Sequence, residues 1–220
     1  MTTFPGSPRI LKGGLVLLDP TSFAVLPNGI IILQYNPDTL TRTLRIKGAS
    51  EGGDRSEALR LTGPPVETFR LEAEIDGVDQ LELPDQNPSV VAHGIFPQLA
   101  ALETLVYPPT ETLQANFALA QAGTLEIMPM LAPFCLFVWS ASRIVPVRLT
   151  DFSITEEAFD PQLNPLRAKV SLTMQVLSVD DLSLADKGGN LYLAYQRRKE
   201  SLSQLYQFGT QAQLGIRGLP

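Results

Sequence analysis

Apolar and polar residues alternate along several segments of the chain, and this period of two predicts β-strands. Residues 66–76 are the clearest case, because four apolar positions there alternate with four charged ones. The unbroken apolar run at residues 30–33 follows a turn signal at Pro27-Asn28-Gly29 and predicts a strand buried on both faces. Further strands are expected at residues 15–18, 40–47, 124–128, 134–139, 145–154 and 167–177.

Apolar residues also recur at helical spacing. Asn87-Pro88 opens such a segment over residues 88–106, and Gly94 and Pro97 predict that this helix is kinked or split. A second segment runs over residues 110–123 and stops at its glycine. Its apolar face consists of Leu113, Phe117 and Ala120. The predicted fold class is therefore α+β, mostly β.

A terminal helix is predicted over residues 190–206, after a hinge signal at Lys187-Gly188-Gly189 and with Asn190 as its cap. Its amphipathic stripe consists of Leu191, Tyr195, Arg198, Leu202 and Leu205. This stripe either packs on the chain's own sheet or docks on a neighbouring protein, and the pattern favours neither.

The length of 220 residues suits one large domain, or one domain with a small appendage. Residues 48–65 are rich in Gly, Ser, Glu and Pro, and they lie between strands of one sheet pattern. We interpret them as a long mobile surface loop. The chain is therefore expected to form a β domain over residues 1–180, followed by a hinge and a helical extension over residues 181–220.

Charged residues make up 18% of the chain, against about 25% in an ordinary soluble domain. A homo-oligomer that covers part of the surface explains this low share, and so does a well-packed monomer. The net charge of −6 and the lack of a basic cluster longer than Arg197-Arg198-Lys199 argue against nucleic-acid binding. The apolar runs are too short to span a bilayer and no signal pattern is visible, so we expect a cytoplasmic product without direct membrane insertion.

The residues that most enzyme sites need are scarce. The chain has one histidine, His93, which we expect at a helix end or turn, and one cysteine, Cys135, which we expect as a small buried hydrophobe. An intrachain disulfide is thereby excluded, and a structural zinc site is not expected. No lysine is followed by Ser or Thr, so a phosphate-binding loop is absent. The carboxylates at 72/74, 156–157 and 180–181 are expected to be solvated. We predict no catalytic, cofactor-binding or metal-binding residue, and no enzyme.

The segment after the predicted strand at residues 30–33 reads Gln34-Tyr35-Asn36-Pro37-Asp38-Thr39-Leu40. It resembles the signature (Phe/Tyr)-Asn-Pro-x-(Ser/Thr)-Leu of the contractile injection system tube protein family, which includes LysM-bearing baseplate proteins of phages and phage-like particles. The residues that carry this first motif are Tyr35, Asn36, Pro37 and Leu40.

The C-terminal half of the chain resembles the same family over a longer stretch. Its blocks occur in order at residues 94–103, 122–129, 137–139, 145–150, 153–160 and 163–172. The last block holds the second motif, which consists of Asn164, Pro165, Arg167 and Ala168. The matched blocks cover most of residues 9–180.

The resemblance implies a tail-tube-type β-barrel or sandwich with an accompanying helix. It also implies a hexameric ring of this chain that joins the inner tube to the baseplate hub or spike and initiates tube assembly, with no cofactor. The implied partners are other copies of the chain, the inner-tube protein and baseplate proteins. In this setting Asn36-Pro37 and Asn164-Pro165 would end strands at fixed geometry, and Arg167 would either pair with a carboxylate across a seam or serve an internal turn.

Many members of that family carry a LysM module after the tube domain. Residues 181–220 are too short for this module plus a linker, so we expect helix 190–206 or a separate protein to provide the anchor. Two other functions stay open. The main inner-tube protein of the same machine is disfavoured by the loop at residues 48–65 and by the terminal helix, and a small-ligand-binding β-barrel is disfavoured by the scarcity of His, Cys and nucleotide motifs.

Overall fold

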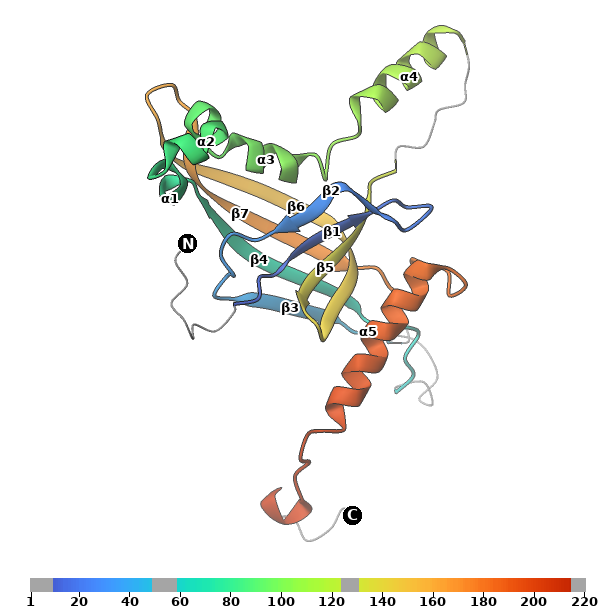
Figure 1. Cartoon of the computed structure of the whole chain (residues 1–220). Helices are drawn as coiled ribbons and strands as arrows, with labels where there is room; N and C mark the ends of the chain where they lie inside the picture. Colours follow the sequence, from blue (N-terminus) through green and yellow to red (C-terminus); the bar gives the residue numbers. More distant parts are fainter. Residues whose placement is uncertain (1–9, 49–58, 124–130, 215–220) are drawn as a thin grey trace.

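The fold is α+β and mostly strand (Figure 1). The computed structural model describes residues 10–48, 59–123 and 131–214. Within these ranges seven strands form one antiparallel sheet in the order β2-β1-β5-β6-β7-β4-β3. They are β1 (Gly14–Leu18), β2 (Val25–Ile32), β3 (Leu40–Arg45), β4 (Val66–Asp76), β5 (Phe134–Ser140), β6 (Arg143–Phe159) and β7 (Pro165–Val176). The two edge strands, β2 and β3, are therefore consecutive in the chain.

The sheet curls strongly across its width. Phe69 on β4 and Phe137 on β5 lie three places apart in the strand order, which in a flat sheet would separate them by about 14 Å. Their ring centroids are nevertheless only 5.5 Å apart, and both side chains are buried. The core therefore fills the inside of the curled sheet, and Leu99 and Leu102 from the helical side of the molecule complete it.

The sheet is not closed into a barrel, which corrects that part of the expectation. Strand β3 pairs with β4 only from Val66 to Leu71, so no strand of the described residues pairs with residues 72–76 of β4 on that side. Strand β2 lies across this gap, which contains a hollow of about 220 Å³ lined by Ile31, Ala73 and Gln98 among other residues. The physical reason is the turn that follows β2, because it leads the chain away before β2 can pair with β4.

Most predicted strands are confirmed. Strand β4 has the predicted bounds, and its apolar face at Phe69, Leu71, Ala73 and Ile75 is buried. Strands β1, β3, β5, β6 and β7 also lie where the pattern placed them, and β6 extends further at both ends. The predicted strand at 124–128 and residues 49–58 of the predicted loop fall outside the described residues.

Strand β2 differs from its prediction. The expected turn at Pro27-Asn28-Gly29 lies inside the strand, where Asn28 has a φ of 56°. The side chains of Ile30 and Ile32 are 60% and 62% exposed. Burial on both faces was therefore wrong, because an edge strand of a single sheet keeps one face open to its surroundings.

The helices of the described ranges are α1 (Val78–Leu81), α2 (Pro88–His93), α3 (Phe96–Glu103), α4 (Thr110–Gln121) and α5 (Lys187–Ser203), with short 3-10 turns at Pro84–Gln86 and Gln211–Leu214. Helices α1, α2 and α3 gather on one side of the sheet, α4 stands away from it, and α5 contacts β6 and extends beyond the sheet (Figure 1). The predicted break in the first helical segment is confirmed at Gly94, whose φ is 56°. A Cβ at Gly94 would strike the carbonyl oxygen of Pro165, so this position requires glycine.

Helix α5 begins earlier than predicted. The expected hinge at residues 187–189 forms its first turn, and Asp186 stands at the N-cap in place of Asn190. Gly188 and Gly189 are buried there. A Cβ on Gly188 would lie 3.3 Å from both Leu182 and Phe134, and a Cβ on Gly189 would strike the carbonyl oxygen of Ser183. These glycines therefore permit close packing of the helix start and do not make the chain flexible.

Candidate assembly surface

Arg167 of the second motif and Gln34, the residue just before the first motif, both bind Asp76, the last residue of β4. Arg167 lies directly opposite Asp76 in the pairing of β7 with β4. Its Nε and Nη2 donate to Asp76 Oδ2 at 2.9 and 2.8 Å, and its Nε lies 3.7 Å from Glu74. The hydrogen bond to Asp76 and the charge of that carboxylate raise the pKa of Arg167. The second motif is thus paired with a carboxylate of the neighbouring strand in the same chain.

Gln34, which immediately precedes the first motif, binds the backbone of the same aspartate. Its Nε2 donates to the Asp76 carbonyl at 2.6 Å, and its Oε1 accepts from the Asp76 N–H at 3.0 Å. This carboxamide imitates one residue of a partner strand and bridges the gap between β2 and β4. These two hydrogen bonds come from a single side chain. They link the chain after β2 to the end of β4, but they do not replace a ladder of backbone hydrogen bonds between two strands.

Within the first motif, Asn36 fixes the chain ahead of β1. Its Oδ1 accepts from the Gly13 N–H at 2.9 Å, and its Nδ2 donates to the Leu11 carbonyl at 2.8 Å. Tyr35 is 44% exposed, and its hydroxyl lies 3.5 Å from Asp79 Oδ2. Desolvation is the main cause that raises the pKa of Tyr35, and the negative charge of Asp79 is the next. Pro37 follows in the turn and half-buried Leu40 opens β3, so this motif joins the two edge strands and sets their separation.

The second motif shapes the turn between β6 and β7. Asp160 Oδ1 accepts from the backbone N–H of Gln162 and of Asn164, each at 2.8 Å, and Asn164 Nδ2 donates to Asp160 Oδ2 at 2.8 Å. The side-chain hydrogen bond from Asn164 is the main cause that lowers the pKa of Asp160. The Pro165 carbonyl accepts from the Ile95 N–H at 2.8 Å, which ties this turn to the start of α3.

 Ala168, the last residue of the second motif, lies beyond this turn: it is part of β7, is 0% exposed and packs in the core.

The predicted docking stripe of α5 divides into two parts. Tyr195 is buried against the sheet and Leu191 is half-buried. Arg198 is exposed and lies 3.5 Å from Ser142 Oγ. Leu202 and Leu205 are 47% and 78% exposed, and Leu205 lies beyond the end of the helix. The first half of α5 therefore packs on the chain's own sheet, and the second half leaves an apolar surface uncovered.

A buried carboxylate that the sequence reasoning missed lies beneath α5. Glu67 is 3% exposed, and its Oε1 accepts from the Tyr195 hydroxyl at 2.7 Å. Its Oε2 lies 3.3 Å from Lys199 Nζ, and Arg42 Nε lies 3.7 Å from Oε1. The alternation of residues in β4 could have revealed this site. Glu67 lies on the same face of the strand as Phe69 and Leu71, so it is a charged residue on an apolar face.

The candidates for enzyme chemistry do not come together. Cys135 is buried, and its desolvation raises the pKa of the thiol to about 12, as expected for a small core residue. His93 is exposed at the end of α2. Over the described ranges, no group of three or more His, Cys, Asp or Glu residues is arranged to hold a metal ion. In the same ranges, no helix combines the length and apolar character needed to cross a bilayer.

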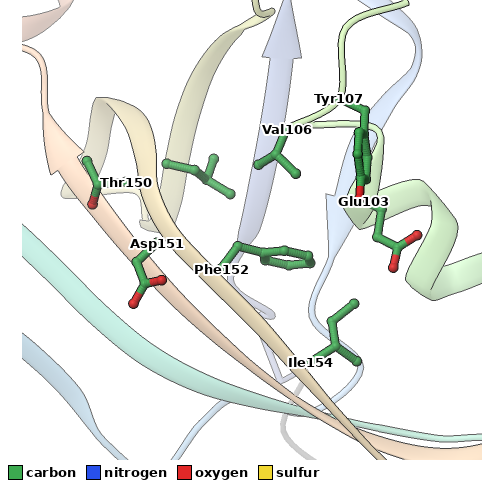
Figure 2. Close-up of a pocket in the computed structure, with 8 residues that line it drawn as sticks. Glu103, Val106, Tyr107, Thr150, Asp151, Phe152 and Ile154 are labelled. Atoms are coloured by element: carbon green, nitrogen blue, oxygen red, sulfur yellow. The ribbon is translucent and has the colours of Figure 1, made fainter. Parts of the chain in front are cut away.

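Apolar side chains are also exposed elsewhere in the described ranges. On the edge strands, Val25, Ile30, Ile32 and Leu44 are exposed, and exposed Ile46 follows directly after β3. A cleft of about 500 Å³ between β6 and the residues that follow α3 has a mixed lining, in which Glu103, Thr150 and Asp151 accompany the apolar side chains. Figure 2 shows Phe152 and Ile154 of β6 on one side of this cleft and Val106 and Tyr107 on the other.

Comparison with models of known protein families and with curated proteins finds no match to this chain. The functional assignment therefore depends on the two motifs and on the surfaces described above.

Proposed function

We propose that this chain is a structural subunit of a phage-tail-like contractile injection system. It forms a hexameric ring with a tail-tube-type subunit fold, joins the inner tube to the baseplate hub, and initiates tube assembly. The resemblance of the two motifs to the tube protein family supports the identity of the machine. The curled sheet with two free edges supports a subunit that completes its structure by assembly.

The exposed aliphatic edge of the sheet is the observation that carries this proposal. Within the described residues, β2 and β3 each pair with a strand on one side only. Ile30 and Ile32 of β2, and Ile46 directly after β3, are at least 60% exposed. A free edge with aliphatic side chains and unpaired backbone groups promotes aggregation unless a partner covers it. A closed ring covers every such edge in a defined way.

The motifs have a physical role in such a ring. The first motif connects β2 to β3, so it determines how far apart the two free edges lie. The hydrogen bonds of Gln34 and Arg167 to Asp76 hold that connection against β4 and β7. Ring closure requires a constant angle between the two contact surfaces of each subunit, and a rigid connection between the edges supplies it.

Light scattering of the purified chain over a range of concentrations, with electron microscopy of the same samples, tests the proposal. We expect a species of six subunits and single rings, and binding of these rings to the inner-tube protein and to the baseplate hub protein. Open-ended filaments would identify the main inner-tube protein instead. A monomer at every concentration that also fails to join these partners would contradict the proposal.

A matched pair of variants locates the contact. Ile30→Lys places a charge on the free edge of β2, and Val91→Lys places the same charge on α2, where the aliphatic side chain is 49% exposed. Both side chains are exposed, so both variants should keep the melting temperature of the isolated chain. We expect ring formation to be lost in Ile30→Lys and retained in Val91→Lys.

A further inference from the structure

Helix α4 stands away from the rest of the molecule (Figure 1). The helix lies wholly within the described residues, and none of its side chains is buried. Phe117 is 66% exposed and Leu113 is 46% exposed. A helix of this length is marginal in water without tertiary packing, so an uncovered α4 requires a partner to be stable.

The exposed face of α4 is a continuous apolar stripe. Leu113, Phe117 and Ala120 are spaced so that they lie on one side of the helix. Glu111 is the one charged residue of α4, and its position in the helical repeat is on the opposite side. The stripe can therefore enter an apolar groove while Glu111 stays in water.

A groove with an apolar part exists on the same molecule. The cleft of about 500 Å³ is lined by the apolar or aromatic side chains of Val106, Tyr107, Leu149, Phe152 and Ile154 and by the polar side chains of Glu103, Thr150 and Asp151. A second hollow of about 240 Å³, next to Cys135, shares Val106 and Leu149 with the cleft. The two hollows thus adjoin, and a helix of roughly 18 Å can place one side chain in each.

The linker directs α4 away from the groove of its own chain (Figure 1). Only Pro108 and Pro109 separate α4 from Tyr107, which lines the groove. Each proline restricts the residue before it to extended conformations, and Pro109 itself has a ψ of 135°. The chain therefore leaves the groove in an extended form and carries α4 outward.

We propose that α4 of each copy inserts Leu113 and Phe117 into the groove between β6 and the end of α3 of a neighbouring copy. The occupant is a second copy because one chain carries both halves of the contact and its linker keeps them apart. Such a contact joins two different surfaces, and a series of these contacts closes into a ring when the rotation per subunit fits. This inference rests on the proposed ring and names one of its contacts.

Cysteine pairing tests the contact directly. Two variants, Phe117→Cys on α4 and Phe152→Cys in the groove, are purified separately, mixed, assembled and mildly oxidised. A disulfide between them can form only between copies. Tyr107→Cys, whose side chain is 68% exposed, serves as a second groove position if Phe152→Cys weakens the fold. The matched control is Ala118→Cys, on the other side of α4, and the unmodified chain with its buried Cys135 is the blank.

We expect cross-linked dimers from Phe117→Cys mixed with either groove variant, and none from Ala118→Cys. Rings that assemble without this cross-link would overturn the α4 contact and leave the proposed ring intact. If no ring forms and no cross-link appears at any concentration, the proposed ring and this contact both fail. A cross-link that forms only within one molecule, in the Phe117→Cys/Phe152→Cys double variant, would show that α4 folds back and would also overturn the inference.

Charge substitutions provide a second readout. Because α4 has no buried side chain, Leu113→Glu/Phe117→Glu should leave the melting temperature of the monomer unchanged. We expect the subunit concentration needed for ring formation to rise by about tenfold or more, since central apolar anchors dominate such contacts. Ala118→Glu should assemble like the unmodified chain, and equal assembly of both variants would contradict the proposal.

Discussion

The hydroxyl of Tyr195 on α5 donates a 2.7 Å hydrogen bond to Oε1 of Glu67 on β4, a carboxylate that is 3% exposed. Lys199 supports the same pair, because its Nζ lies 3.3 Å from the other carboxylate oxygen and 4.3 Å from the centre of the Tyr195 ring. Desolvation and the hydrogen bond to Glu67 raise the pKa of Tyr195, so its hydroxyl stays protonated and remains a donor. These contacts attach the first half of α5 to the sheet.

Removing this donor should destabilise the protein. Tyr195→Phe leaves the buried Glu67 with one hydrogen bond fewer, and the free energy of unfolding should fall by about 1–3 kcal/mol. Tyr206→Phe is the control, because Tyr206 is 68% exposed and its change should alter stability by less than about 0.5 kcal/mol. Urea denaturation measures both. Equal stabilities of the two variants would show that the Tyr195–Glu67 bond contributes nothing.

Truncations at two positions should behave differently. Removal of residues 204–220 leaves α5 whole and should preserve the folded chain. Removal of residues 190–220 deletes Tyr192 and Tyr195, which are 6% and 4% exposed, and leaves Glu67 without its partners on α5. Loss of large core side chains costs about 3–5 kcal/mol each, so the shorter chain should be insoluble or unfolded. Soluble yield and thermal unfolding by circular dichroism distinguish the two truncated proteins. A well-folded protein that lacks residues 190–220 would show that α5 is not part of the core.

The Gln34 bridge should protect the end of β4. Gln34→Ala removes both hydrogen bonds to the Asp76 backbone, and the Asp76 amide should then exchange its hydrogen faster. Gln34→Glu is the matched variant, because a carboxylate still accepts from the Asp76 N–H but cannot donate to the Asp76 carbonyl. Hydrogen exchange measured by NMR should rank the amide's protection as unmodified chain, then Gln34→Glu, then Gln34→Ala. Unchanged exchange in Gln34→Ala would mean that the bridge does not hold the gap.

The turn between β6 and β7 should lose support in acid. The pKa of Asp160 is lower in the folded chain than its ordinary value, mainly because Asn164 donates to its carboxylate. A depressed folded pKa contributes stability above the unfolded pKa, and this contribution is lost as the pH falls through the folded pKa. Asn164→Ala should raise the pKa of Asp160 toward its ordinary value, as an NMR titration of the carboxyl carbon would detect. An identical titration curve in both proteins would refute the role of Asn164.

Local patterns in the sequence were enough to predict most of the secondary structure. The alternation over residues 66–76 predicted β4 to the residue, since a period of two leaves one face for the core. Gly94 predicted the break between α2 and α3, because glycine tolerates the positive φ found there. The scarcity of His and Cys, and the apolar surroundings of Cys135, likewise predicted a buried thiol.

Long-range contacts decided what these patterns could not. Pro27-Asn28-Gly29 has the composition of a turn, yet it lies within β2, in an irregular stretch between the pairs Val16–Ile30 and Leu18–Val25 of the ladder with β1. Gly188 and Gly189 read as a hinge, yet the close approach of residues 182–184 makes them the packed start of α5. In both cases a glycine is compatible with a flexible link and with a tight backbone contact. The segment that packs beside it determines which of these two structures forms.

The relation between the motifs also depended on the fold. Each motif alone indicates a turn, because proline lacks the N–H group and restricts the residue before it. That Gln34 and Arg167 meet at Asp76 follows from the order of the strands, which brings the end of β4 beside the start of β7 and opposite the end of β2. The sheet stays open for the same reason, since the chain turns at Asn36-Pro37 before β2 can pair with β4. The asparagine and proline residues thus determined where the chain turns. The order of the strands determined that Gln34 and Arg167, which lie beside these turns, contact the same aspartate.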